Sequence, residues 1–205
     1  MCVTVCAGSR RHRRSEQQGQ PGQFDYYLLS LSWSPQFCSN HDDPGQCQGN
    51  RPFSFVVHGL WPQFERGWPQ ACQPSSPVPE DIVQAMLSLM PSPRLIQHEW
   101  DTHGTCSGLD QKAYFNLIRT AYGAIHVPKD YAQPLREVIQ MPAQILDHFE
   151  AANGSFPRDS MRLGCSGRYL SEVRICMTKD LKGRQCGADV RDNCSAPQLI
   201  MRPVR

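Results

Sequence analysis

Residues 98–106 read HEWDTHGTC, and residues 55–62 read FVVHGLWP. The first segment contains His98, Glu99 and His103, the second contains His58, and both have glycine and tryptophan beside the histidines. Imidazole titrates near neutral pH, so a pair of histidines can supply an acid and a base together. A lone histidine beside apolar residues is more often a structural group, but two such segments in one chain favour paired acid–base catalysis.

A zinc site is an alternative, because a helical His-Glu-x-x-His sequence places two imidazoles on one helix face. Here His98 and His103 are five positions apart. That spacing corresponds to about 500° of helical rotation, so the two rings would diverge. A zinc hydrolase is therefore only the third hypothesis, and it requires the helix to break at Gly104.

The composition fits a single domain. The chain has 205 residues, 40% of them hydrophobic, which is enough for a sizeable core. Residues 1–23 differ, because four arginines near position 12 are followed by polar residues without apolar periodicity. We expect this part to be a disordered basic segment or leader remnant, and residues 24–205 to form one domain. The short apolar start precedes its arginines, unlike an export signal, which suggests a misassigned start or a truncated leader.

The net charge of the expected domain is close to zero. The chain has 21 basic and 19 acidic residues, and residues 1–23 contain four and one of them. The remainder has 17 basic and 18 acidic residues, a net charge of −1. Any nucleic-acid binding must therefore come from a local cleft. No apolar run is long enough to cross a bilayer, so we expect no membrane contact.

Ten cysteines are many for a chain of this length in a reducing compartment. None of them forms a Cys-x-x-Cys pair, which argues against zinc ribbons and thioredoxin chemistry. Cys2 and Cys6 lie in the atypical segment, and the other eight form an even set that we expect to be disulfide-bonded. The sequence alone leaves 105 connectivities open for eight cysteines.

The periodicity predicts an α+β fold with a central antiparallel sheet flanked by helices, because regular βαβ alternation is missing. The strand at 53–57 should end at His58, where Gly59 and Pro62 turn the backbone and leave the imidazole facing a cleft. Trp100 should lie in the core. We expect strands at 24–33, 53–57, 161–165 and 169–177, helices at 79–90, 93–100, 111–125 and 142–152, and a loop from 181 onward.

The two histidine segments resemble the active-site segments of the ribonuclease T2 family. Residues 31–38 (LSWSPQFC) and 170–176 (LSEVRIC) are similar to an early and a late strand of that family. The resemblance covers residues 24–195 and implies a disulfide-stapled, secreted or periplasmic ribonuclease. The disulfide pairs that it implies are Cys38 with Cys47, Cys72 with Cys106, Cys165 with Cys194, and Cys176 with Cys186.

The resemblance also implies a mechanism. RNA carries its own nucleophile, the 2′-hydroxyl, so the enzyme needs a base, an acid and donors around the phosphate, but no metal or cofactor. By resemblance His103 is the base and His58 the acid, and the products are 2′,3′-cyclic phosphates and then 3′-phosphates. Glu99 would lie against the phosphate or an imidazole and adjust its pKa.

Four further residues are candidates for substrate binding. His98 would contact phosphate, Trp61 would stack on a base or fill the core, and Gln63 would read a base edge with low specificity. Thr102 stands where the family usually has lysine, so we expect reduced activity, and the change Thr102→Lys should raise turnover. An unchanged rate would mean that another cation, Lys112, Arg94 or Arg66, already fills the role.

The first hypothesis is thus a monomeric endoribonuclease that acts on single-stranded RNA without an obligate protein partner. The main alternative is a catalytically impaired, disulfide-rich RNA-binding or signalling protein on the same scaffold. RNA cleavage in the presence of EDTA distinguishes these hypotheses from a zinc hydrolase.

Overall fold

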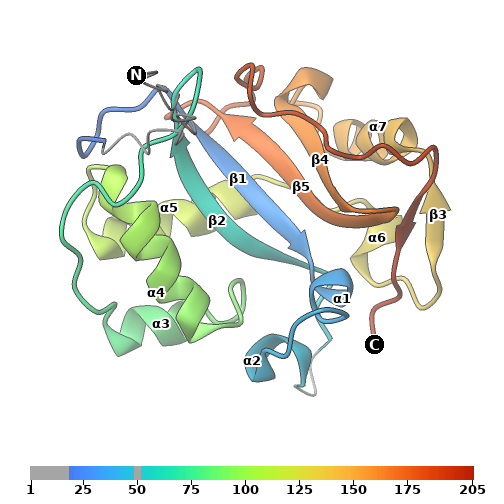
Figure 1. Cartoon of the computed structure of the whole chain (residues 1–205), viewed down its shortest axis with the longest axis horizontal. Helices are drawn as coiled ribbons and strands as arrows, with labels where there is room; N and C mark the ends of the chain where they lie inside the picture. The colour runs from blue at the N-terminus through green and yellow to red at the C-terminus, as the bar shows by residue number, and fades with distance from the viewer. Residues whose placement is uncertain (1–18, 49–51) are drawn as a thin grey trace, which may run out of the picture.

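The computed structural model describes residues 19–48 and 52–205 (Figure 1). The described residues form a six-stranded sheet in the order β2-β1-β5-β6-β3, with β4 also paired to β5. All strand pairs are antiparallel except β5 with β6, so the predicted α+β class is confirmed. The strands are β1 Tyr26–Trp33, β2 Phe55–Gln63, β3 Val138–Gln140, β4 Met161–Ser166, β5 Tyr169–Met177 and β6 Leu199–Met201.

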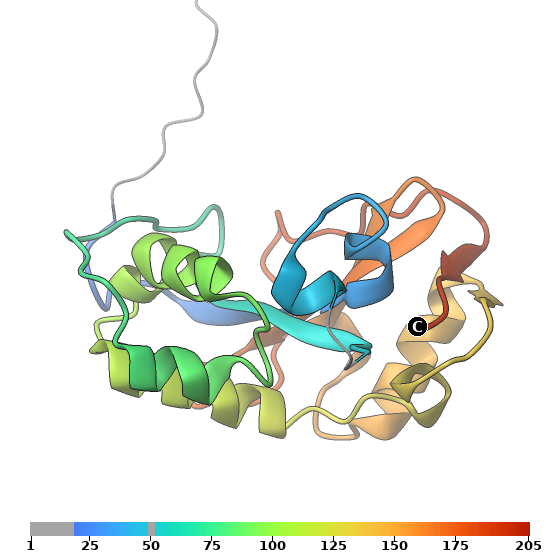
Figure 2. The same ribbon diagram turned by 90° about the horizontal axis from the view of Figure 1, so that it is seen from below.

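Helices lie on both sides of the sheet. Helices α3, α4 and α5 lie beyond β2, whereas α6 and α7 lie beyond β4 (Figures 1 and 2). The α-helices are α1 Ser34–Phe37, α2 Pro44–Cys47, α3 Glu80–Met86, α4 Pro93–Thr102, α5 Gln111–Gly123, α6 Lys129–Ala132 and α7 Pro142–Ala152, and the 3₁₀ helices are η1 Gly104–Cys106 and η2 Arg158–Ser160.

The two faces of β1 have different surroundings, because successive side chains of a strand point to opposite faces. Leu29 and Leu31 belong to the main hydrophobic core, together with residues of α4, α5 and α7. Tyr26 and Leu28 belong to a smaller cluster with Cys176 on the other face. This second face also carries the small side chain of Ser30, which leaves space above the sheet for polar groups from neighbouring strands.

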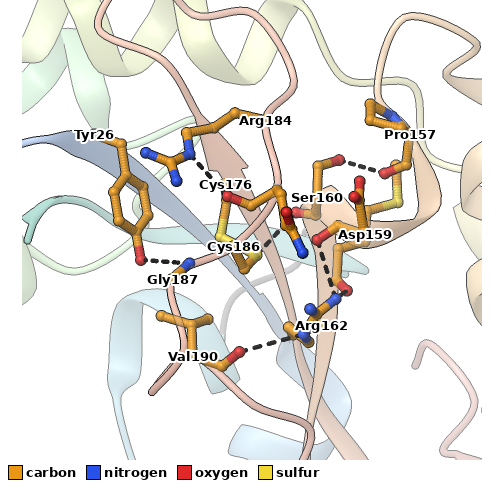
Figure 3. The surroundings of a disulfide bond; sticks show 12 residues. Tyr26, Pro157, Asp159, Ser160, Arg162, Cys176, Arg184, Cys186, Gly187 and Val190 are labelled. Atoms are coloured by element: carbon orange, nitrogen blue, oxygen red, sulfur yellow. Dashed lines mark hydrogen bonds between the residues drawn. A yellow bond between two sulfur atoms is a disulfide. The ribbon is translucent and has the colours of Figure 1, made fainter. Parts of the chain in front are cut away.

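The disulfide pairing that the family resemblance implied is the pairing in the structure. The four bonds join Cys38 to Cys47, Cys72 to Cys106, Cys165 to Cys194, and Cys176 to Cys186. The last bond ties β5 to the C-terminal loop, where the Gly187 amide donates to the Tyr26 hydroxyl at 3.2 Å (Figure 3). It thereby fixes the loop that brings Asp189 and Val190 to the candidate site.

The structure departs from two of the expected elements, and it leaves part of the N-terminal segment undescribed. Strand β2 does not end at His58 but continues to Gln63, and the tail expected to be loop contains β6. Cys2, Cys6 and most of the segment expected to be disordered lie outside the described residues. Of that segment, residues 19–23 are described, and the Gly22 amide donates to the Cys106 carbonyl at 2.9 Å.

Candidate active site

A β-bulge sets the orientation of His58. In the pairing of β1 with β2, Ser30 is opposite Gly59 and Leu31 is opposite Val57, so His58 is the extra residue on β2. A bulge interrupts the alternation of side chains along a strand and changes the direction in which the side chain of the additional residue points. The His58 side chain is 34% exposed as a result, although it comes from the middle of a strand. The imidazole is therefore partly exposed, and the cause is a bulge and not the predicted strand end.

Helix α4 carries the second set of groups. Pro93 occupies its first turn, and the Ser92 hydroxyl accepts a hydrogen bond from the Leu95 amide, which is the usual chemistry of a helix start. The buried positions of the helix are Ile96, Glu99 and Trp100, so the apolar stripe includes one carboxylate. Trp100 lies in the core as predicted.

Glu99 is almost fully buried, with 1% of its side chain exposed. Its Oε2 accepts a hydrogen bond from Trp61 Nε1 at 2.7 Å, and its Oε1 lies 3.8 Å from His58 Nε2. A Cβ atom at Gly59 would lie 1.9 Å from Glu99 Oε2, so glycine is required where this carboxylate approaches β2. Burial raises the pKa of Glu99 to about 7, against the opposing effects of His58 and the Trp61 bond.

His103 follows α4 as its C-cap residue and lies against Trp61. Its ring stacks on the indole with a centroid distance of 5.2 Å and an interplanar angle of 30°. Its Nδ1 is buried and has no hydrogen-bond partner among the described residues. Burial, followed by the positive charges of His98 and His58, lowers the pKa of His103 to about 3. His103 is therefore a neutral imidazole across the neutral and mildly acidic range.

His58 has the opposite electrostatic environment. Its Nδ1 lies 2.9 Å from Glu172 Oε1 on β5, and its ring meets Trp61 edge-on at a centroid distance of 5.1 Å. Burial opposes the charged form, but the hydrogen bond to Glu172 and the negative charge of that carboxylate outweigh burial and raise the pKa of His58 above 6.5. Two imidazoles with opposite proton preferences thus contact one indole.

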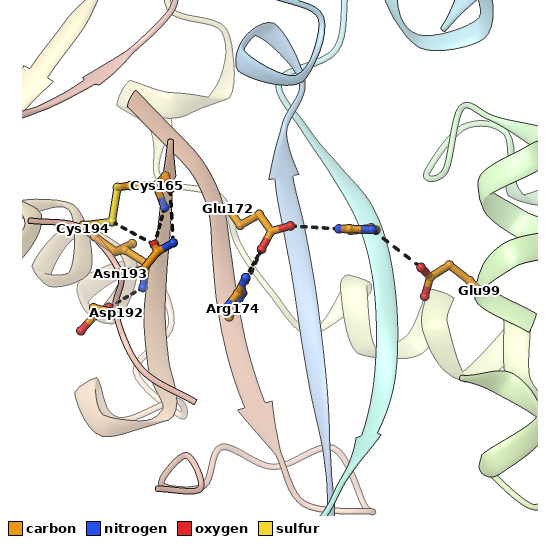
Figure 4. Close-up of polar contacts among 9 residues, drawn as sticks. Glu99, Cys165, Glu172, Arg174, Asp192, Asn193 and Cys194 are labelled. Carbon is orange, nitrogen blue, oxygen red and sulfur yellow. Dashed lines mark hydrogen bonds and ion pairs between the residues drawn. A yellow bond between two sulfur atoms is a disulfide. The ribbon is translucent and has the colours of Figure 1, made fainter. Parts of the chain in front are cut away.

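Glu172 and Arg174 were not predicted as site residues. They lie opposite Ser32 and Ser30 of β1, and these small side chains let the β5 groups reach over β1 toward His58 (Figure 4). Arg174 Nε and Nη2 both lie 2.8 Å from Glu172 Oε2. Burial opposes ionisation of Glu172, but its bond to His58 and the charges of His58 and Arg174 outweigh burial and lower its pKa to about 2.

A cavity of about 450 Å³ opens beside these groups. The four residues predicted to bind substrate, His98, Trp61, Thr102 and Gln63, all line this cavity. His103 and Arg174 line it as well. His58 and Glu99 do not line the cavity, but both contact Trp61, which does line it. The lining residues are Leu28, Trp61, Gln63, Trp68, Gln70, His98, Thr102, His103, Arg174, Asp189 and Val190.

Comparison with known proteins identifies the family. The profile of the ribonuclease T2 family matches residues 24–186. A ribonuclease from Aeromonas hydrophila is 34% identical over 206 residues, which cover 93% of this chain and 91% of the relative. The chain belongs to the ribonuclease T2 family.

Solved structures of similar fold agree with this assignment to the T2 family. A variant of RNase MC1 in complex with 5′-UMP superposes with a TM-score of 0.66 at 25% identity, covering 86% of this chain and 97% of that one. An RNase-related protein from Calystegia sepium has a TM-score of 0.72 at 21% identity, covering 88% and 98%. The second likeness concerns the fold alone.

Thr102 is the residue expected to replace a lysine of the family, and the structure shows which charges lie near it. Thr102 Oγ1 lies 3.5 Å from His98 Nδ1, and both residues line the cavity. None of Lys112, Arg94 and Arg66 lines this cavity, and Lys112 lines a different one beside α3 and α5. The cation that does line it is Arg174.

Two features of the described ranges bear on other classes of function. Residues 19–48 and 52–205 contain no group of three or more His, Cys, Asp or Glu side chains placed to hold a metal ion. Within the same ranges, no helix has the length and apolar character needed to span a bilayer.

Proposed function

We propose that this T2-family endoribonuclease cleaves single-stranded RNA by a metal-independent transfer of the scissile phosphate to the neighbouring 2′-oxygen. The observation that carries the proposal is that two imidazoles in different surroundings contact the Trp61 ring: His58 lies beside the Glu172 carboxylate, whereas the buried Nδ1 of His103 has no partner among the described residues. The raised pKa of His58 and the lowered pKa of His103 favour a charged His58 and a neutral His103 at mildly acidic pH. A base and an acid are therefore available together before the substrate reacts.

In the first step, His103 takes the proton of the 2′-hydroxyl, and the 2′-oxygen attacks phosphorus. The bond between phosphorus and the 5′-oxygen breaks as His58 gives its proton to that oxygen, which leaves a 2′,3′-cyclic phosphate. In the second step, neutral His58 takes a proton from water and the water oxygen attacks phosphorus. The bond to the 2′-oxygen then breaks, and His103 returns its proton to give a 3′-phosphate.

Glu99 supports both steps. Its pKa of about 7 keeps the carboxyl group largely protonated in the acidic range, so it can donate a hydrogen bond to a phosphate oxygen. Its Oε1 has no hydrogen-bond partner among the described residues and lies 3.8 Å from His58 Nε2, the nitrogen proposed to protonate the leaving oxygen. The charge that develops on the phosphate is thus met by a proton donor beside the acid.

The cavity provides the surfaces that RNA recognition requires. His98 and Thr102 offer hydrogen bonds to phosphate, and Trp61 offers an indole face, although part of it is already stacked on His103. Trp68 is 46% exposed on the same cavity and presents a second flat surface for a base. Gln63 lines the cavity but is buried, and its Nε2 already donates to the Pro62 carbonyl at 3.0 Å, which favours low base specificity. The RNase MC1 complex with 5′-UMP supports a nucleotide ligand in this fold.

The proposed setting is an oxidising compartment, either secreted or periplasmic. Four disulfides in the described chain support this location, because such bonds persist outside the reducing cytosol. We propose that the enzyme acts as a monomer, without a cofactor or an obligate protein partner.

A digest of homopolymeric RNA in excess EDTA tests the proposal. We expect cleavage that leaves 2′,3′-cyclic phosphates, visible by ³¹P NMR, and loss of cleavage in His58→Ala and His103→Ala. His126→Ala is the matched control, because His126 is exposed and does not line the cavity. Cleavage abolished by EDTA would point to a metal enzyme.

The second candidate, an impaired RNA-binding protein, is favoured by one observation. Thr102 brings no charge to the cavity, and Asp189 adds a carboxylate. Binding of RNA without any cleavage would support this alternative.

A further inference from the structure

The cavity has an uneven charge distribution for an enzyme that handles phosphate. Among its lining residues, Asp189 carries a negative charge, and Thr102 is neutral. Arg174 is the one lining residue of the described chain with a permanent positive charge. A phosphodiester gains negative charge as it is attacked, so a fixed cation beside it stabilises the transition state more than the ground state.

Arg174 is held in a defined orientation by one edge only. Its Nε and Nη2 point to Glu172 Oε2, both at 2.8 Å, and its side chain is 29% exposed. Guanidinium has five N–H donors in a rigid plane, so three remain after these two contacts. Nη1 forms no hydrogen bond to any residue in the described ranges. The free edge is therefore available to an anion in the cavity.

The sheet leaves room for this arrangement. Gly164 of β4 is opposite Glu172 in the strand register, next to an irregularity in the pairing. A Cβ atom at Gly164 would lie 3.3 Å from Glu172 Oε2 and 3.7 Å from Arg174 Nη2. A larger residue would press on the pair, so the neighbouring strand accommodates the two charged side chains.

The pair also connects the cavity to the proposed acid. Glu172 Oε1 lies 2.9 Å from His58 Nδ1, and its Oε2 binds Arg174, so one carboxylate lies between two cations (Figure 4). Protonated His58, Glu172 and Arg174 together carry a net charge of +1. Glu172 thus fixes Arg174 without cancelling the positive charge of the group.

We propose that Arg174 is a further catalytic residue, which binds a non-bridging oxygen of the scissile phosphate through its Nη1 edge and supplies the charge that Thr102 lacks. This inference rests on the proposed ribonuclease function. It changes the expectation for Thr102→Lys, because a cation is already present. A second one should raise kcat/KM less than threefold in the parent enzyme.

The test is a double-mutant cycle of Arg174→Gln and Thr102→Lys, with kcat and KM measured on homopolymeric RNA. Arg174→Gln should lower kcat/KM about 100-fold, comparable to removal of one transition-state donor. Thr102→Lys in the Arg174→Gln background should recover at least tenfold, because it returns a cation to the cavity. Arg119→Gln is the matched control, since Arg119 binds the Ala85 carbonyl outside this cavity.

The alternative role is positioning alone, in which Arg174 merely orients Glu172 and His58. In that case Thr102→Lys would not rescue Arg174→Gln. That result would overturn the proposal, as would an unchanged rate in Arg174→Gln.

Two measurements keep the test independent of folding and of the proposed function. Thr102→Lys alone in the parent background needs no damaged variant, and a gain of tenfold or more would contradict the proposal. Calorimetric titration with inorganic phosphate or 5′-UMP reports anion binding without any cleavage, and Arg174→Gln should weaken this binding at least tenfold. If the parent protein binds these anions but does not cleave RNA, the proposed function fails while the Arg174 site stands.

Discussion

Replacement of Glu172 by glutamine should shift the alkaline limb of the pH–rate profile to lower pH. Glu172 accepts a hydrogen bond from His58 Nδ1 at 2.9 Å and contributes a negative charge beside the ring. A hydrogen bond to a charged group is worth about 1.5–3 kcal/mol, and one pKa unit corresponds to about 1.4 kcal/mol. The pKa of His58 should therefore fall by about one to two units.

The sign of this shift follows from the role of His58. An acid must be protonated, so activity is lost as the pH rises through its pKa, which the Glu172 carboxylate holds above 6.5 in the parent enzyme. In Glu172→Gln the loss begins at lower pH, and Arg174, no longer neutralised, acts in the same direction. The acidic limb, which depends on His103, should remain in place.

The assay is the initial rate of homopolymer cleavage in EDTA, measured from pH 3 to about 8 in buffers of constant ionic strength. Glu80→Gln is the matched control, because Glu80 lies on α3 and, within the described part of the chain, its side chain accepts a hydrogen bond from Gln84 alone. An alkaline limb at the same pH in Glu172→Gln and the parent enzyme would refute the reasoning, since His58 would then owe its protonation to something else.

Three further predictions concern neighbouring features. Gly59→Ala should lower kcat/KM at least tenfold while the protein still folds, because its Cβ would lie 1.9 Å from Glu99 Oε2; normal activity would show that Glu99 can move freely. Glu99→Gln should reduce cleavage. In the parent enzyme the free energy of unfolding should fall as the pH rises from about 4.5 to 7, because the carboxyl group ionises in the unfolded chain before it does so in the folded one, and Glu99→Gln should remove this fall. Thermal unfolding measured across that pH range is the check. The double change of Cys72 and Cys106 to serine should lower the free energy of unfolding by about 3–4 kcal/mol, since the bond closes a long loop; urea unfolding with an unchanged midpoint would contradict it.

The sequence predicted the elements with strong local signals. Helix α4 has Ser92 and Pro93 at its start and an apolar stripe, and α7 has Pro142 at its start, so both could be located from local chemistry. Strands β3 and β6 have three residues each, too few for a recognisable alternation, and they pair with each other across a long stretch of chain. Their existence depends on tertiary pairing.

The extent of β2 shows how strand order can override local signals. Gly59 and Pro62 resemble a turn, but β2 lies at the edge of the sheet, where proline is tolerated, and the bulge accommodates the extra residue. The sequence pattern therefore placed the end of this strand at the wrong residue.

The predicted site residues were incomplete for a similar reason. His58, Glu99 and His103 stand out by residue type, and the structure brings them together around Trp61. Glu172 and Arg174 reach His58 only because β5 pairs with β1, which no local pattern shows. Their signal was available in part, since two charged residues two positions apart in an apolar strand must share one face.

The central claim is that the two imidazoles carry opposite proton loads before substrate binds. An NMR titration of the His58 and His103 ring protons, assigned with the single alanine variants, measures this directly. We expect that at a pH of about 5 His58 is charged and His103 is neutral, with pKa values above 6.5 and about 3. Two rings that titrate together near pH 6.5 would contradict it.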